Sequence, residues 1–468
     1  MSSTPEQTAD VAAAAAPYLE SWLEHQRRKL RVPGVQAAVR VGDRLVLDTA
    51  LGVADLGTGA PLTPAHLFRI ASHSKTFTAT AVLQLVEAGR MRLDDPIATW
   101  VPALAGTPLA PVTVRELLGH QGGVIRDGGD NDHWQLLQPF PDERLLLEIA
   151  AGEGSVFDRN EHFKYSNIGY SLLGLAIGAV TGAGYAAHVQ AAVVDRLGLA
   201  DTGPEWDPAR AGEFAAGHTG LLDGEDARLT IPHVDTRAMA AATGFFSTAR
   251  DLTAFGAAHF AGDGSLLSEA SKRLMRRPES VVQAHGKPPR HYGLGMDLRS
   301  AGDRTLVGHS GGYPGHITRT WIDPDAQVVV SVLTNAVDGP ADALARGLFA
   351  LLDLALAAPG GPQPPTAELA RHTGRFVNLW GVTDVALLGG RLVLLHPGSP
   401  EPAEDFLELT PEAPGVLRQE AVAGFGSAGE PVTYSWAEDG TAASVRLGGI
   451  SAWPEEVFRA RRAAQVAG

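Results

Sequence analysis

Ser72 and Lys75 are the pair of residues in this sequence best suited to nucleophilic catalysis. They precede an apolar segment, Thr76 to Val86, that is typical of a buried helix. Residues three apart share one face of a helix, so the hydroxyl and the amine would lie side by side. The helix dipole would favour negative charge on the serine oxygen, and a lysine in a dry site can accept the serine's proton. The pair therefore predicts a nucleophilic serine with a lysine as its proton partner.

The alternative interpretation of a single Ser-x-x-Lys is structural. Ser72 would then cap a helix, and Lys75 would be a solvated residue of the first turn. The chain has only five lysines, and only Lys75 has a serine three residues before it. This spacing alone leaves both interpretations open, so a catalytic site has to be judged by the other groups that it needs.

Tyr165 and Asn167 offer two of those groups, because acyl transfer needs a proton acceptor and residues that orient the reacting atoms. They precede an apolar helical pattern and so stand where a loop meets a helix. A lysine ammonium nearby would push Tyr165 towards phenolate, and Asn167 could bond Lys75 or a substrate amide. Taken alone, Tyr165 is more simply explained as a packing aromatic residue.

A third segment, His309-Ser310-Gly311-Gly312, follows a predicted strand. It would start a glycine-rich edge on which a substrate backbone could add as an extra strand. His309 could bind a carboxylate or carry a proton, and the N–H groups of Gly312 and Ser72 could form an oxyanion hole. Taken alone, the segment would be a glycine turn with a surface histidine.

The residues Gly308 to Gly312 also match G-x-S-x-G, the nucleophile elbow, with Ser310 as the nucleophile. That motif requires a helix directly after the serine, whereas Pro314, Gly315 and a strand-like segment follow here. Metal catalysis has little support, since the sixteen histidines are scattered and form no H-E-x-x-H pair. We therefore expect no metal and no cofactor.

The elements around these residues predict an α/β (α+β) fold with an antiparallel sheet flanked by helices. A hairpin over Val35–Ala50 turns at Gly42-Asp43, and a helical insertion occupies about residues 98–285. We expect the hairpin to join later strands in one sheet, with helices from both chain ends packed on it. The later strands are expected at Gly293–Leu298, Arg304–Gly308, His316–Ile322 and Gln327–Leu333. The two helices are expected at Ala12–Lys29 and Asp338–Ala357.

A proline-rich linker over residues 359–365 separates this part from the C-terminal residues. Short strands around Gly389-Gly390 and around residues 437–440 predict a small, all-β barrel or sandwich. The predicted domains are therefore residues 1–358 and 366–468.

Composition limits the partners. A formal net charge of −15 argues against nucleic acid or an anionic membrane, and no apolar run is long enough to span a bilayer. The chain has no cysteine, and its first ten residues carry acidic but no basic side chains, unlike a signal peptide. We expect a cytoplasmic protein that binds a small molecule or a short peptide; the formation of a homo-oligomer stays open.

Ser-x-x-Lys, Tyr-x-Asn and His-x-Gly, in this order, resemble the β-lactamase and penicillin-binding-protein-like serine hydrolases over about residues 30–356. The group it looks most like contains class C β-lactamases, D-amino-acid peptidases and related esterases. The resemblance implies that Ser72 is acylated, that Lys75 is its proton partner and that Tyr165 is the general base. It further implies that substrate-binding groups are provided by Asn167, His309, Gly311 and Gly312, the last through an oxyanion N–H.

His309 stands where this family more often has lysine, so a substrate carboxylate would meet a less reliably charged group. The resemblance therefore implies hydrolysis of amides or esters of small molecules or D-amino-acid peptides, with weak or absent β-lactamase activity. Two alternatives are a carboxylesterase with little peptidase activity and a catalytically silent binding or sensor protein.

Overall fold

The computed structural model describes residues 5–283, 285–302, 304–357, 366–423 and 426–467. Residue contacts divide the chain into two compact units, Val32–Asp342 and a second one formed by Met1–Arg31 with Ala343–Gly468. The domain limits expected from the sequence stay a prediction, and the predicted linker lies outside the described residues.

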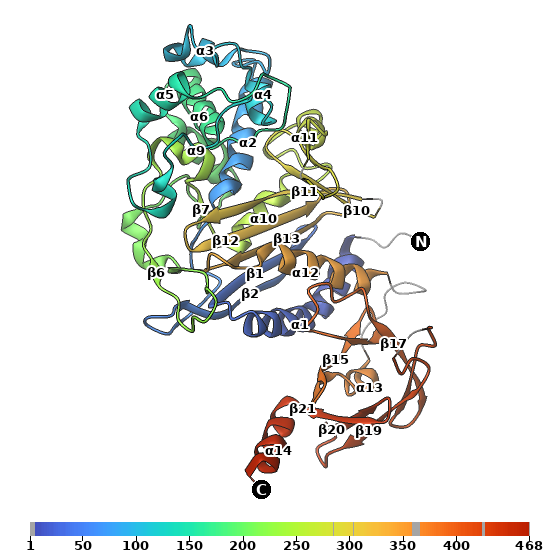
Figure 1. The fold of residues 1–468 in the computed structure, drawn as a ribbon. Coiled ribbons are helices and arrows are strands. Elements are labelled where there is room, and N and C mark those ends of the chain that lie inside the picture. The colour runs from blue at the N-terminus through green and yellow to red at the C-terminus, as the bar shows by residue number, and fades with distance from the viewer. Residues whose placement is uncertain (1–4, 284, 303, 358–365, 424–425, 468) are drawn as a thin grey trace. The chain divides into compact units, whose positions relative to one another are not determined.

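The unit of residues 32–342 is built on a nine-stranded antiparallel sheet (Figure 1). The order is β3-β2-β1-β13-β12-β11-β10-β9-β8, so the early hairpin pairs with the late strands as predicted. Its strands are β1 (Gly34–Val41), β2 (Arg44–Asp55), β3 (Ala60–Pro61), β8 (Ser280–Val282), β9 (Arg290–Tyr292), β10 (Asp297–Ala301), β11 (Arg304–Tyr313), β12 (His316–Asp323) and β13 (Val328–Thr334). This sheet confirms the expected fold class.

The middle of the sheet is apolar on both faces. Every residue of β13 is buried, and β1 is buried except at Arg40. Strands covered on both faces read as continuous apolar runs, which explains the valine-rich sequences of both strands. The hairpin between β1 and β2 turns at Gly42, whose φ of +58° lies in the left-handed region that glycine adopts without strain.

Two strand limits differ from the prediction. The expected strand Gly293–Leu298 begins only at Asp297, because residues 293–296 form a turn closed by a 2.8 Å bond from Gly293 N to Met296 O. Within this turn Gly295 has φ +79° and packs against Ala79 of a neighbouring helix. By contrast, β11 does not end at Gly308 but pairs with β12 as far as Tyr313.

Helices of the same unit surround one buried helix, α2. In Figure 1, α2 lies beside α6 and α9, which come from distant parts of the chain. The longer helices are α2 (Ser74–Glu87), α5 (Glu143–Gly152), α6 (Asn167–Thr181), α10 (Ala249–Ala257) and α11 (Glu269–Arg276). The shorter ones are α3 (Ile97–Trp100), α4 (Val114–Leu118), α7 (Tyr185–Val189), α8 (Asp195–Leu197) and α9 (Ala240–Thr243), and two short ribbons pair β4 (Phe68–Arg69) with β7 (Phe246–Ser247) and β5 (Gly217–His218) with β6 (Thr230–Ile231).

Local sequence signals explain where the central helices begin and end. The Ser166 side chain caps α6 by accepting from Gly169 N at 2.8 Å, and Gly182 ends the helix with φ +72°. Phe77 of α2 stacks on Phe245 and Phe255, with ring centroids 4.3 and 3.9 Å from its own.

In the described chain no single helix is long and apolar enough to cross a membrane. One pair of helices bent by 78°, Asn167–Thr181 with Tyr185–Leu197, is long and apolar enough when the two are taken together, by length and composition alone.

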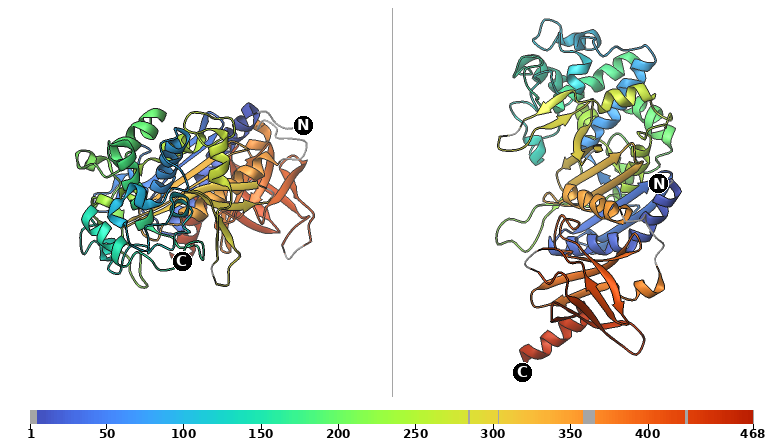
Figure 2. Two further views of the ribbon diagram at one scale, coloured as in Figure 1. Left: turned by 90° about the horizontal axis from the view of Figure 1, so that it is seen from above. Right: turned by 90° about the vertical axis from the view of Figure 1, so that its right-hand side faces the viewer.

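The second unit contains a closed eight-stranded barrel, as expected for the C-terminal residues. Its strands are β14 (Gly374–Asn378), β15 (Gly381–Leu388), β16 (Arg391–Leu395), β17 (Leu407–Ala413), β18 (Val416–Gln419), β19 (Pro431–Trp436), β20 (Ala442–Leu447) and β21 (Ile450–Pro454). The barrel confirms the expected β domain. Two helices accompany it: α13 (Ala367–Ala370) precedes the barrel, and α14 (Glu455–Ala467) follows β21 and is the helix at the C-terminus in Figure 2.

The first helix, α1 (Pro5–Lys29), and most of α12 (Ala341–Leu356) belong to the barrel's unit. Gln26 Nε2 of α1 donates to the carbonyl oxygens of Pro397 at 2.6 Å and Ser399 at 2.8 Å. Arg391 of β16 donates to the carbonyl oxygen of Leu354 in α12 at 2.9 Å. These bonds join both helices to the barrel segment.

Candidate active site

The structure brings Ser72, Lys75 and Tyr165 together. Ser72 lies in a 3-10 turn, η1 (Ala71–His73), and Lys75 follows in the first turn of α2. The Tyr165 hydroxyl donates to Ser72 Oγ at 2.7 Å, and Lys75 Nζ lies 3.3 Å from the same oxygen. Ala71 has φ +44°, a left-handed conformation that costs a non-glycine residue about 1–2 kcal/mol and is typical of functional turns.

Lys75 is fully buried, and its amine is held by two acceptors besides the serine. Nζ lies 2.7 Å from Asn167 Oδ1 and 2.9 Å from the carbonyl oxygen of Ala242 in α9. Burial lowers the pKa of Lys75 well below its ordinary value; the Asp127 carboxylate opposes this shift, and the Arg126 guanidinium adds to it. The site therefore makes the neutral amine more accessible than it is for a lysine in water.

The hydrogen-bond partners of Ser72 agree with a neutral Lys75. An amine has two hydrogens and one lone pair, which suit two acceptor oxygens and the hydroxyl proton of Ser72. Ser72 Oγ in turn accepts the proton of Tyr165. An ammonium would donate to all three oxygens and leave the Ser72 proton without an acceptor among these groups. In the neutral form, the lone pair of the lysine nitrogen is available to accept the serine proton.

Tyr165 differs from the expectation that it is pushed towards phenolate. Burial raises its pKa, and the bond to Ser72 and the Arg126 cation offset the rise only in part. The Lys75 nitrogen lies 4.7 Å from the centroid of the Tyr165 ring, but a neutral amine lacks the charge that would stabilise a phenolate. In the resting site Tyr165 is therefore a neutral phenol and a hydrogen-bond donor.

Asn167 connects Lys75 to a buried acid that the sequence analysis missed. Its Nδ2 donates to Asp127 Oδ1 at 2.7 Å, while its Oδ1 faces Lys75. Arg126 pairs with the other oxygen of Asp127 at 3.0 Å. Asp127 lies in a loop between α4 and α5, where no periodic pattern or spacing marked it. The acid fixes the orientation of the Asn167 amide and so keeps its oxygen on Lys75.

His120 contacts both the backbone and the ring of the segment that carries Tyr165. Its Nδ1 accepts from Ser166 N at 3.1 Å, and its ring centroid lies 4.5 Å from that of Tyr165. The residue is 2% exposed, and burial lowers its pKa well below the ordinary value. A neutral His120 therefore positions the backbone between Tyr165 and Asn167.

His309 is a buried member of β11 and not a surface histidine in a glycine turn. Its Nδ1 lies 2.6 Å from the Ser310 carbonyl oxygen, and its Nε2 lies 3.0 Å from the Tyr292 hydroxyl. Burial lowers its pKa well below the ordinary value. A neutral His309 therefore donates from Nδ1 to the carbonyl and accepts from Tyr292 at Nε2.

Gly311 and Gly312 have different surroundings on β11. A Cβ atom at Gly311 would clash with the Ile70 carbonyl oxygen and stand 2.5 Å from Thr318 Oγ1, so this glycine lets β11 approach the Ser72 turn. A two-residue turn joins β11 to β12, so Tyr313 and His316 beside it form a hydrogen-bonded pair. Hydrogen-bonded and non-hydrogen-bonded pairs alternate along antiparallel strands, so the next residue, Gly312, directs its N–H away from β12. The pairing with β10 ends at Gly308, which leaves this edge open for a substrate.

The nucleophile-elbow alternative does not fit the structure. Ser310 lies in the middle of β11, and β12 follows that strand after the turn at Pro314-Gly315. A nucleophile elbow needs a strand, a sharp turn at the serine and a helix. Ser310 is therefore a strand residue on the exposed face.

Comparisons with known proteins place this site in context. A family model described as Beta-lactamase matches residues 19–355. Esterase EstB of Burkholderia gladioli is 31% identical over 206 residues, which are 41% of this chain and 52% of that protein. The structure of D-amino acid amidase from Ochrobactrum anthropi SV3 with L-phenylalanine is 26% identical with a TM-score of 0.58, covering 68% of this chain and 91% of that one. An octameric penicillin-binding protein homologue from Pyrococcus abyssi shares the fold, with a TM-score of 0.64, 22% identity and coverage of 93% and 99%.

Proposed function

Since this chain belongs to the Beta-lactamase family, which includes esterases and D-amino-acid amidases, we propose that it is a serine hydrolase acylated on Ser72. Its substrates are esters or amides of small molecules, or peptides that contain D-amino acids. One observation carries the proposal: Ser72 Oγ lies within hydrogen-bonding distance of both a buried lysine nitrogen and a tyrosine hydroxyl.

In the acylation step, Ser72 Oγ bonds to the substrate carbonyl carbon while its proton passes to the neutral Lys75 amine. The carbonyl oxygen gains the negative charge, and the N–H groups of Ser72 and Gly312 stabilise it. The bond to the leaving group then breaks, and Tyr165 gives that group its proton. The acyl-enzyme is left with a Lys75 ammonium beside a Tyr165 phenolate, a pair of opposite charges.

Deacylation reverses these proton transfers. The Tyr165 phenolate takes a proton from water, whose oxygen bonds to the acyl carbon. As the bond to Ser72 Oγ breaks, the Lys75 ammonium returns the serine's proton. All three residues regain their starting protonation. In this scheme Tyr165 is the general base only while Lys75 is charged. The raised pKa of Tyr165 in the resting site, where Lys75 is neutral, is therefore compatible with that role.

The neutral His309 supports uncharged esters and amides as substrates. A lysine at this position would give a substrate carboxylate a permanent cation, whereas burial keeps this histidine uncharged. Carboxylate-bearing β-lactams should therefore react weakly. The relatives support both bond types, since one is an esterase and another is a D-amino acid amidase.

The test combines covalent labelling with a substrate panel. A fluorophosphonate should add its mass to the peptide that contains Ser72 in the wild type and in the control Ser310→Ala, but not in Ser72→Ala. Turnover of chromogenic esters and of D- and L-aminoacyl amides should fall at least about 10⁴-fold in Ser72→Ala. Labelling at Ser310 would overturn the assignment, turnover of esters alone would identify a carboxylesterase, and absence of both labelling and turnover would indicate a binding protein.

Assembly is a separate proposal. The octameric state named for the Pyrococcus abyssi relative supports a homo-oligomer here as well. Light scattering on the full chain should give a mass that is a multiple of 49.1 kDa, and a mass of one chain at all concentrations would contradict it.

A further inference from the structure

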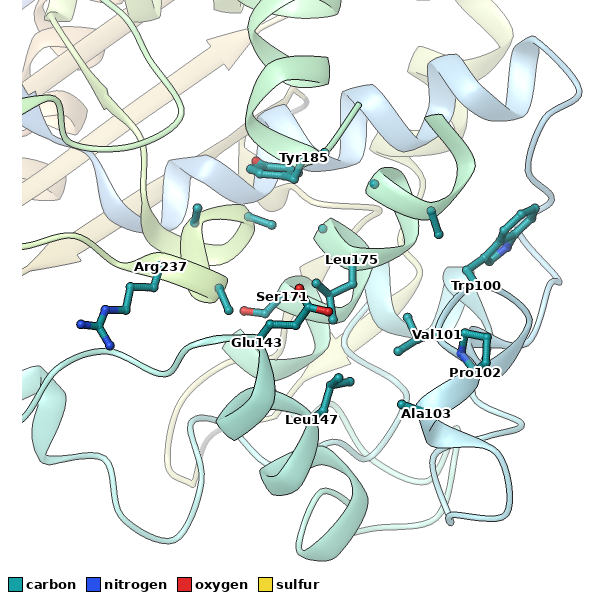
Figure 3. A pocket seen from close by; sticks show the side chains of 17 residues that line it. Trp100, Val101, Pro102, Ala103, Glu143, Leu147, Ser171, Leu175, Tyr185 and Arg237 are labelled. Carbon is teal, nitrogen blue, oxygen red and sulfur yellow. The ribbon is translucent and has the colours of Figure 1, made fainter. Parts of the chain in front are cut away.

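A second cavity, of about 510 Å³, lies among the helices of the 32–342 unit (Figure 3). It is lined by residues of α5, α6 and α9 and by the segment 100–103, and by none of Ser72, Lys75, Tyr165 and Asn167. Its volume falls within the range that binds small molecules in proteins.

One part of the lining of this cavity is apolar. Its walls include Leu147, Leu175 and the ring of Tyr185. The two hydroxyl groups nearby already have partners, since Ser171 Oγ donates to Asn167 O at 2.9 Å and Tyr185 OH lies 2.8 Å from Thr78 Oγ1. A ligand would therefore place hydrocarbon there.

Small residues keep this space open. A Cβ atom at Gly174 would stand 2.6 Å from Ala241 Cβ, so the floor is closed by tight packing of α6 on α9. A Cβ atom at Gly178, one turn along α6, would meet nothing closer than Gly184 Cα at 3.6 Å. The volume beside Gly178 can therefore accept atoms from a ligand or from a larger side chain.

One charged group points into the cavity. Figure 3 shows the Glu143 carboxylate directed towards Ser171 and Leu175, whereas the Arg237 guanidinium points away. Glu143 is the only acid in the lining and is an exposed residue, and its carboxylate forms no ion pair or hydrogen bond with the side chains that the structure describes. A carboxylate at the mouth of an apolar cavity favours a cation with a hydrocarbon body.

We propose that this cavity is a second ligand site, which binds a small hydrophobic amine with its ammonium at Glu143 and its hydrocarbon between Leu147, Leu175 and Tyr185. Such a ligand would contact α9, whose Ala241 carbonyl accepts from Thr78 Oγ1 at 2.7 Å and whose Ala242 carbonyl holds Lys75. Binding is independent of the proposed function. The effect of the bound amine on Ser72, transmitted through α9, rests on that function.

Calorimetry on the full chain tests the binding. The probe is N,N-dimethyl-2-phenylethylamine, a tertiary amine that cannot accept an acyl group from Ser72. It should bind to the wild type and to Ser72→Ala alike, while 2-phenylethanol and phenylacetate, which lack the cation, should bind at least about tenfold more weakly. Glu143→Gln removes the carboxylate and Gly178→Leu fills the cavity, so both should lose at least about tenfold in affinity. Glu148→Gln, on the same helix outside the cavity, is the matched control.

Three results would overturn the site: no saturable binding, binding of 2-phenylethanol as tight as that of the amine, or full affinity in both Glu143→Gln and Gly178→Leu. The effect on Ser72 is measured as the rate of fluorophosphonate labelling with and without the amine. The rate should change in the wild type and in Glu148→Gln, and stay constant in Glu143→Gln. If Ser72 is labelled at the same rate with and without a saturating amine, the proposed effect through α9 is refuted. If Ser72 is not labelled at all, the proposed function is refuted, and the result of the binding experiment is unaffected.

Discussion

Gly311 packs so closely on Ile70 that no side chain could stand between β11 and the carbonyl oxygen of Ile70. Ile70 begins the turn that carries Ser72, so the strand and the nucleophile turn share one contact. The position of Ser72 therefore depends on a glycine almost 240 residues later in the chain.

A methyl group at Gly311 should separate the two segments. We expect Gly311→Ala to lower the free energy of unfolding by about 1–3 kcal/mol and to reduce kcat strongly, because the added Cβ displaces the Ser72 turn. Gly152→Ala on α5 is the control, since a Cβ atom there would meet nothing within 4 Å. Thermal melts and ester turnover measure both effects, and equal losses in the two variants would contradict the assigned contact.

The proton transfers predict different failures for Lys75 and Tyr165. With a p-nitrophenyl ester, whose leaving group needs no proton, Tyr165→Phe should release up to one equivalent of nitrophenolate and then stall as acyl-enzyme. Lys75→Met should give no such burst, because Ser72 loses its proton acceptor. Stopped-flow absorbance and intact mass would follow both events.

The double variant distinguishes this scheme from independent roles. Lys75→Met with Tyr165→Phe should behave like Lys75→Met alone, since no acyl-enzyme forms for Tyr165 to release. Multiplicative losses, or a burst that survives without Lys75, would show that the two residues do not act in sequence.

The pH dependence should follow the charge of Lys75. Acylation needs the neutral amine, so kcat/KM should rise as pH rises through the lowered pKa of Lys75. The Arg126 cation lowers that pKa, and Arg126→Gln should therefore raise it and move the rising limb to higher pH. Arg144→Gln, an exposed change on α5, should leave the profile in place. A limb that stays fixed or moves to lower pH in Arg126→Gln would contradict the assignment of the limb to Lys75.

Substrate choice should follow the neutral state of His309. The wild type should hydrolyse uncharged esters faster than cephalosporins, which carry a carboxylate. His309→Lys should lower the KM for acidic substrates by about tenfold, the value of one hydrogen bond to a charged group, with little change for neutral esters. Faster turnover of cephalosporins by the wild type would be incompatible with the proposed substrate class.

Truncation tests how the barrel segment supports the terminal helices. The domain limits predicted from the sequence, residues 1–358 and 366–468, would allow the first part to fold alone. The contacts predict instead that a chain ending at Ala357 is destabilised, because Gln26 and the carbonyl of Leu354 lose their partners Pro397, Ser399 and Arg391. Size-exclusion chromatography and thermal melts should show an aggregating or early-melting fragment. A fragment as stable as the full chain would show that these bonds contribute little.

Local signals predicted the fold well where the residue type or the apolar pattern decides it. Gly42 marked the first hairpin, because a left-handed φ favours glycine there, and the apolar pattern after Asn167 indicated α6. The false strand at residues 293–296 has a different cause. Its turn is imposed by packing of Gly295 on Ala79, a contact between distant segments that no local pattern carries.

The candidate site divides in the same way. Ser72 of η1 and Lys75 of α2 lie three residues apart where the turn runs into the helix, so their spacing was sufficient to join them. Asp127 bonds to Asn167 from a loop that carries no periodic pattern, and the backbone of Ala242 has no side-chain signature, so neither could be found before the chain was folded. The pKa of Tyr165 was predicted in the wrong direction because burial, which the sequence does not show, outweighs the neighbouring charges.

The groups around Ser72 come from the turn before α2, the segment before α6, the helix α9 and the strand β11. Contacts between such distant segments close large loops and are formed slowly during folding. After dilution from denaturant, helical signal should therefore return before any ester is cleaved. The time at which ester turnover recovers would therefore report the last long-range step of folding in the 32–342 unit.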